Sequence, residues 1–99
     1  MNYISVVRGK LKGSPEQAKA MHDGTVEKLS AMTRPLGAIG HRPHLNPKDP
    51  GEFLAIDTWN NIENLQKFLS DSKVAEAFGA LFDGMPDVSI WVESDWASF

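Results

Sequence analysis

The hydrophobic period of the chain changes within residues 53–82, and this change constrains the fold more than any other feature. Residues 53–59 (FLAIDTW) form a short apolar run that ends in Asp-Thr-Trp. After Asn60 the apolar residues recur at steps of three and four, at Ile62, Leu65, Phe68 and Leu69. Short apolar runs are typical of strands, and recurrence at helical spacing is typical of helices. The pattern predicts a strand that leads directly into a helix, with Asn60 as its N-cap and Glu63 in a capping box.

The residues before this unit predict two strands and one long helix. Residues 3–11 are rich in β-branched side chains and predict a strand. Ser14, Pro15 and Gln17 then form a capping box with proline at the first helical position, which predicts a helix that ends near Pro35. Residues 38–45 predict a weaker strand at a sheet edge, because Pro43 cannot donate to a neighbouring strand. The residue types at positions 46–51, which are rich in proline, glycine, asparagine and aspartate, predict a turn after this strand.

The residues after Leu69 predict a broken helix and a last strand. Ser70, Asp71 and Ser72 interrupt the helical pattern, and Asp71 is placed to cap a restart at Lys73. Residues 83–86 (DGMP) end that helix, and residues 88–92 (VSIWV) predict the final strand. The order is strand, helix, strand, strand, helix, strand. It predicts an α+β, ferredoxin-like βαββαβ domain over residues 1–99, with both helices on one face of a four-stranded antiparallel sheet.

Three of the predicted strands are apolar on both faces. A strand with one face in water alternates between apolar and polar residues, but residues 4–7, 53–56 and 88–92 do not. Two helices cover only one face of a sheet. We therefore expect a second copy of the chain to cover the other face, giving a homodimer.

Composition narrows the possible partners. The formal net charge is −3 with neutral histidines, so no basic surface indicates binding to nucleic acid or to a membrane surface. The chain has no cysteine, which removes disulfides, thiolate metal ligands and thiol nucleophiles. It shows no signal segment or membrane span, and the expected location is the cytoplasm.

The stretch FLAIDTWNNIENLQKFLSDSKVAEAF, with the order and length of the other elements, resembles the dimeric α/β-barrel superfamily and its antibiotic-biosynthesis-monooxygenase-like domains. The resemblance implies a pocket between helices and sheet, in which Trp59 matches the pocket tryptophan of the family. Haem-degrading members carry a histidine on the second helix, where this chain offers Phe68 or Phe78, so haem degradation is not expected. The expected site has no cofactor and no metal.

Two histidines, His22 and His44, and the carboxylate of Asp57 are the candidate catalytic residues. His22 lies on the apolar face of the first predicted helix, where it either transfers a proton to or from a substrate or is a core residue bonded to a neighbour. His41 and His44 flank Pro43, and their spacing does not form a metal signature. We expect one of them to face the pocket, with His44 favoured because the loop after it can bend over a ligand. Asp57 is either paired with an arginine or histidine or acts as a base.

Large aromatic side chains accompany these groups. Trp59, Trp91 and Phe78, with His41, are the residues expected to hold a small, flat substrate. By resemblance the function is that of a cofactor-independent monooxygenase acting on an aromatic or polyketide-like substrate, with His22 or a His44–Asp57 pair as the base. The alternatives are a cofactor-free isomerase or cyclase and a non-catalytic small-molecule-binding dimer. The catalytic alternatives require a histidine nitrogen that faces open cavity volume.

Overall fold

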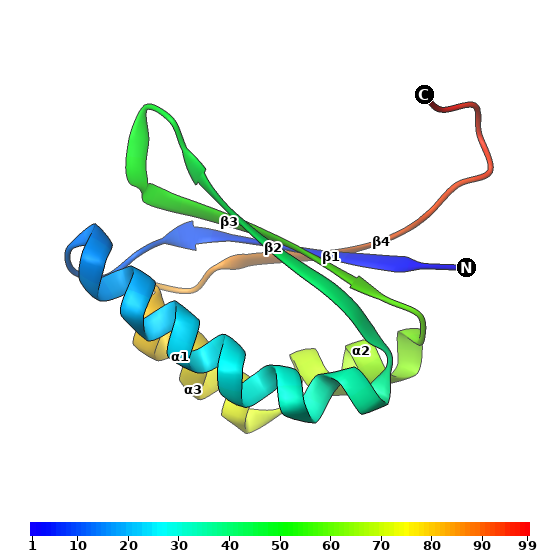
Figure 1. The fold of residues 1–99 in the computed structure, drawn as a ribbon, viewed down its shortest axis with the longest axis horizontal. Helices are drawn as coiled ribbons and strands as arrows, with labels where there is room; N and C mark the ends of the chain where they lie inside the picture. Colours follow the sequence, from blue (N-terminus) through cyan, green and yellow to red (C-terminus); the bar gives the residue numbers. More distant parts are fainter.

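A computed structural model describes all of residues 1–99. Its elements, in chain order, are β1 (Tyr3–Lys10), α1 (Pro15–Thr33), the short 3₁₀ helix η1 (Arg34–Leu36), β2 (Ala38–Asn46), β3 (Asp49–Trp59), α2 (Ile62–Leu69), α3 (Ser72–Leu81) and β4 (Asp87–Val92). The strands form one sheet in the order β2-β3-β1-β4, and every neighbouring pair is antiparallel. All helices lie on one side of this sheet (Figure 1). The predicted ferredoxin-like α+β fold is confirmed.

The helix-start signals act as predicted at two of three sites. Ser14 forms the capping box with Gln17 at the start of α1. Asp71 caps α3, where its side chain accepts a hydrogen bond from the backbone N–H of Lys73. The prediction for α2 is wrong by one residue, because the N-cap is Asn61 rather than Asn60.

The second strand pair is longer than expected. β3 begins at Asp49, so only residues 47–48 turn between β2 and β3, and the predicted turn over residues 46–51 is too long. The extended pairing carries β2 along the whole edge of the sheet.

None of the helices is long and apolar enough to cross a membrane.

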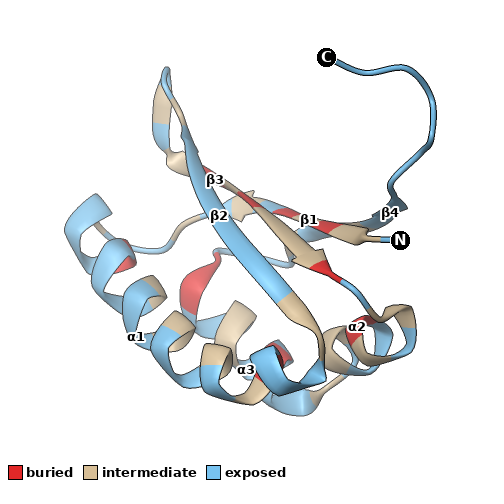
Figure 2. Ribbon diagram, turned by 45° about the vertical axis from the view of Figure 1, so that its right-hand side comes forward, coloured by how far each residue is buried: buried red, intermediate tan, exposed pale blue.

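The core lies between the sheet and the helices, where β1 and β3 run through the middle of the sheet (Figure 2). Its main cluster contains Val7, Phe53, Ala55, Leu81 and Phe82. A Cβ atom on Gly9 would lie 2.7 Å from the ring of Phe82, so the absence of a side chain there lets the ring pack on β1. Burial of these apolar groups holds the helices against one face of the sheet.

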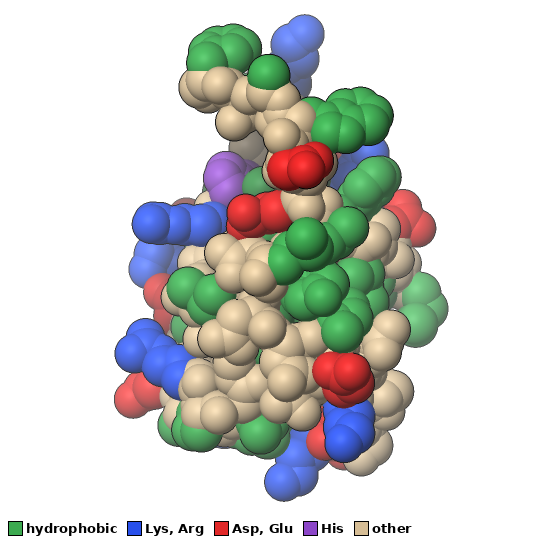
Figure 3. Space-filling model, turned by 90° about the vertical axis from the view of Figure 1, so that its right-hand side faces the viewer, with side chains coloured by type: hydrophobic (Ala, Val, Ile, Leu, Met, Phe, Trp, Pro, Cys, Tyr) green, Lys and Arg blue, Asp and Glu red, His purple; other side chains and the backbone are tan.

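The other face of the sheet, here called the open face, is not covered by any element of the chain. Half-buried apolar side chains lie in its middle, namely Ile4, Val6, Leu54 and Ile56. Trp91 of β4 lies beside Ile4 and is 61% exposed. The segment after β4 rises on this side of the sheet, away from the helices, and ends in apolar side chains that project from the body (Figures 1 and 3).

Candidate functional site

A cavity of about 260 Å³ lies between the helices and the covered face of the sheet. It is lined by 22 residues, of which 14 are hydrophobic, so its interior is mainly apolar. One face of α1 forms a long wall from His22 to Arg34. The aromatic lining residues are Phe53, Trp59, Phe68, Phe78 and Phe82. A cavity of this kind, with a few polar groups among aromatic walls, is typical of a small-molecule site.

The aromatic residues support one another through tilted ring contacts. Trp59, at the end of β3, is 3% exposed, and its ring centroid lies 5.3 Å from that of Phe68 in α2. Phe53 contacts Phe82, and Phe82 contacts Phe78 of α3. Rings fixed in this way provide flat apolar walls, which suits an aromatic ligand.

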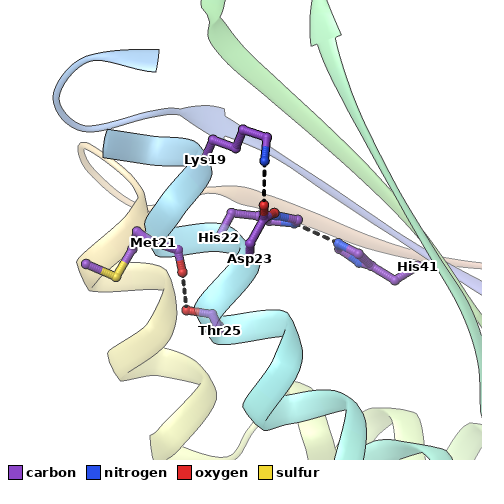
Figure 4. A network of polar contacts seen from close by, with 6 residues as sticks. All are labelled: Lys19, Met21, His22, Asp23, Thr25 and His41. Carbon is purple, nitrogen blue, oxygen red and sulfur yellow. Dashed lines mark hydrogen bonds and ion pairs between the residues drawn. The ribbon is translucent and has the colours of Figure 1, made fainter. Parts of the chain in front are cut away.

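Three polar side chains from three elements meet at one end of the cavity. The strand register pairs His41 of β2 with Asp57 of β3, and both side chains face the helices. His41 Nδ1 is in hydrogen-bond contact with Asp57 Oδ1, and Ser5 Oγ donates to Asp57 Oδ2 at 3.4 Å. His22 reaches across from α1, where its Nε2 lies 2.8 Å from His41 Nε2 (Figure 4).

Two further side chains of α1, Asp23 and Lys19, extend this series of contacts towards solvent. The connected side chains are here called the polar row, and they are Asp57, His41, His22, Asp23 and Lys19. His22 Nδ1 lies 3.0 Å from Asp23 Oδ1, and Lys19 Nζ donates to Asp23 Oδ2 at 2.8 Å (Figure 4). The hydrogen bonds from Lys19 and His22 hold the pKa of Asp23 below its ordinary value. The same contact with Asp23 raises the pKa of Lys19. Asp23 is therefore an exposed carboxylate at the outer end of a row that begins at Asp57.

All four ring nitrogens of the two cavity histidines have protein partners in this arrangement. Each Nε2 faces the other Nε2, His41 Nδ1 faces Asp57, and His22 Nδ1 faces Asp23. The two ring centroids lie 5.1 Å apart, with an angle of 25° between the ring planes. Neither histidine presents a free nitrogen to the cavity, so the condition that the sequence analysis sets for a catalytic function is not met in this arrangement. Proton transfer to a ligand requires the contact between the two Nε2 atoms to open.

The structure brings together five of the seven residues singled out from the sequence. His22, His41, Asp57, Trp59 and Phe78 all line the cavity. The close pairing of Asp57 is with a histidine, which was one of the partners considered for it.

His44 and Trp91 lie elsewhere, and the expectation that they face the pocket is wrong. Successive strand residues point to opposite faces of a sheet. His44 pairs with Leu54, and Trp91 pairs with Ile4, so both lie on the open face. The Trp91 indole N–H donates to Ser89 Oγ at 2.8 Å instead of reaching the cavity.

Several lining residues and the outer end of the polar row were missed in the sequence. Lys19 is exposed and pairs with Asp23, and the spacing of four residues between them is a recognisable pairing signal on a helix. Arg34 is the only lysine or arginine among the lining residues, and it lies at the opposite end of α1 from His22. Twelve residues make about 3.3 helical turns, so the helical period does not place Arg34 on the same face as His22, and the sequence offered no signal for it.

The three-dimensional arrangement matches solved structures over nearly the whole chain. SnoaB from Streptomyces nogalater, described as a cofactor-independent oxygenase, superposes with a TM-score of 0.74 at 15% identity, over 96% of this chain and 95% of that one. Rv0793 from Mycobacterium tuberculosis superposes with a TM-score of 0.70 at 15% identity, over 99% of this chain and 100% of that one. A protein described as an antibiotic biosynthesis monooxygenase superposes with a TM-score of 0.69 at 14% identity, over 95% of this chain and 99% of that one.

The chain shares its fold with these solved structures. No protein-family model matches the sequence, and no curated protein matches it either. At these identities the structural matches describe the backbone arrangement, and the chemistry of the cavity depends on its own residues.

Proposed function

We propose that this protein is a cofactor-independent monooxygenase acting on a small, flat, electron-rich aromatic molecule such as a phenol or an anthrone-like ring. The observation that carries the proposal is the His41–Asp57 pair at one end of a cavity walled by aromatic side chains. The shared fold with SnoaB, a cofactor-independent oxygenase, supports it. The corresponding pair expected from the sequence was His44–Asp57, and His41 takes that place.

His41 Nε2 is the proposed base. The Asp57 carboxylate accepts the hydrogen bond from His41 Nδ1–H, which fixes the ring and stabilises the imidazolium that forms after proton transfer. An apolar setting keeps water away from the resulting carbanion. The aromatic walls hold the ring plane of the substrate and leave its acidic C–H directed at the polar end.

The reaction balances without an external reductant. Removal of a proton from a ring CH₂ group gives a carbanion, which passes one electron to O₂. The substrate radical and superoxide combine into a peroxide, which takes up a proton and becomes a hydroperoxide. Loss of water from the hydroperoxide then gives a ketone. The sum is CH₂ + O₂ → C=O + H₂O, in which the substrate carbon supplies all four electrons.

His22 must move for this reaction to occur. In the present arrangement its Nε2 occupies the position beside His41 Nε2 that a substrate C–H would take. His22 lies on a helix and its side chain is 14% exposed, so rotation of the side chain opens the site without unfolding α1. We propose that substrate binding replaces the contact between the two Nε2 atoms.

One observation favours a second function. Because every ring nitrogen of His22 and His41 has a protein partner, the polar row is satisfied without a substrate. A non-catalytic protein that binds small aromatic molecules would have such an arrangement. An isomerase or cyclase that uses the same base without oxygen is the alternative within catalysis.

Oxygen uptake separates these functions. The purified protein is mixed with anthrone or a polyhydroxylated aromatic ring in air-saturated buffer, and dissolved oxygen and product mass are followed, with ¹⁸O₂ in a parallel run. A monooxygenase consumes one O₂ per product and places one ¹⁸O atom in it. Product formation without uptake indicates an isomerase or cyclase. Tight binding without any product, across the panel of rings, contradicts the catalytic proposal.

The oligomeric state belongs to the same proposal. We propose a homodimer formed through the open face, because its apolar side chains, with the exposed Trp91, have no cover within the chain. A cytoplasmic location and a single domain over residues 1–99 stay predictions from the sequence.

A further inference from the structure

The protons in the polar row can be counted. Three hydrogen bonds join Asp57, His41, His22 and Asp23 end to end, and each of them needs one proton. Two neutral imidazoles supply only two. Asp23 accepts from Lys19 as well as from His22, so it is an ionised acceptor and not the source of the third proton. The row therefore contains one additional proton, on the histidine pair or on Asp57, and this count holds for either tautomer of each ring.

We infer that the histidine pair and its two flanking carboxylates hold one excess proton. We infer also that this proton keeps His22 of α1 hydrogen-bonded to His41 of β2 and so closes this end of the cavity. The inference rests on the proposed function only for its catalytic consequence. With the proton present, the three hydrogen bonds are complete and His41 Nε2 is occupied. Asp23 is a positioning residue in this scheme, because it touches His22 and not the substrate.

The charges that face the row are few. From α1 come Lys19 and Asp23, from β3 comes Asp57, and from β1 comes only the Ser5 hydroxyl. Arg42 of β2 points to the open face, and the residues of α2 and α3 that line the cavity are apolar. With the excess proton, two carboxylates are balanced by Lys19 and one imidazolium charge. Without it, the row has one net negative charge.

Loss of the excess proton breaks the hydrogen bond between His22 and His41. The carboxylates keep their hydrogen bonds from the two Nδ1–H groups, so the contact between the two Nε2 atoms is the one left without a proton. Two lone pairs then face each other at a distance where a hydrogen bond had been, and they repel. The histidines separate, and His41 Nε2 becomes free to act as a base. The proposed reaction should therefore speed up as pH rises through the titration of the pair.

An NMR titration of the imidazole nitrogens tests this inference without any substrate. Uniformly ¹⁵N-labelled wild-type protein is compared with Asp23→Asn, and with Glu27→Gln as a control that removes an exposed charge from the same helix. His44 on the open face is the internal reference. We expect the signals of His22 and His41 to titrate together. In Asp23→Asn the excess proton should bind about tenfold more weakly, because one of the two negative charges that hold it is removed.

Two results would overturn the inference. One is independent titration of His22 and His41, each like His44. The other is a shift in Asp23→Asn no larger than the shift in Glu27→Gln. If oxygen uptake is found, its pH profile should follow the shared titration, and Asp23→Asn should keep its rate at lower pH than the wild type. Absence of uptake together with a shared titration would refute the proposed function and support the proton inference.

Discussion

Arg34 places a positive charge at the end of the cavity opposite to the His22–His41 contact. Arg34 is the C-cap of α1, and its backbone lies twelve residues beyond that of His22, which corresponds to about 18 Å along a helix axis. A guanidinium group offers five donors in one plane and is always charged. An acidic group would be held at Arg34 only in a substrate long enough to reach from His41 to this end of the cavity.

Replacing Arg34 with glutamine should weaken the binding of such a long acidic substrate about tenfold, because a hydrogen bond to a charged group is lost. The loss should raise KM and leave kcat nearly unchanged, since Arg34 contacts the substrate far from the reacting carbon. Calorimetric binding and steady-state oxygen uptake give the two quantities. Arg42→Gln, on the open face, is the matched control and should behave as wild type. Equal KM values in the two variants would show that Arg34 does not bind the substrate.

Which histidine belongs to the cavity could be predicted only in part. The helical period of residues 18–32 placed His22 on the correct face, since apolar spacing alone determines that face. The choice between His41 and His44 depended on the register of β2, which shifts at a bulge between Ala38 and Gly40. A one-residue shift moves every following side chain to the other face, and sequence spacing does not show where such a bulge lies.

At the scale of elements, the start of α2 offers a sharp stability test. Asn61 accepts a hydrogen bond from the backbone N–H of Asn64 at 2.9 Å, whereas no hydrogen bond is formed by the side chain of Asn60. Asn61→Ala should lower the free energy of unfolding by about 1 kcal/mol. Asn60→Ala, the matched control, should change it by less than about 0.5 kcal/mol. Denaturant unfolding measures both values, and an equal loss in the two variants would contradict the assigned cap.

The order and type of the elements were predictable because several local signals agreed. The capping box at Ser14, the cap at Asp71 and the change of period after Asn60 each mark a boundary that depends only on nearby residues. The two errors are a shift of one residue at the cap of α2 and a shift of four residues at the start of β3. Contacts between distant residues, such as His22 with His41, are not visible in any local pattern.

At the scale of the whole molecule, the open face makes the oligomeric state testable. Ile56 lies in the middle of this face, so Ile56→Glu would bury an unpaired charge in a dimer formed through it. Sedimentation of the wild type at micromolar concentration should show a dimer, and Ile56→Glu should sediment as a folded monomer. Ala75→Glu, exposed on α3, is the control and should stay dimeric. A monomeric wild type would contradict the proposed assembly.

The central claim is that His41, held by Asp57, takes a proton from a substrate carbon in the cavity. Hydrogen–deuterium exchange at the CH₂ group of anthrone, followed by NMR in D₂O without oxygen, measures this step apart from oxidation. The wild type should accelerate the exchange over buffer. His41→Gln should lose roughly 10²–10⁴-fold of this acceleration, as is usual for a general base, and His44→Gln should keep it. Exchange by His41→Gln at the wild-type rate, or no acceleration by the wild type across a panel of anthrones, would contradict the account.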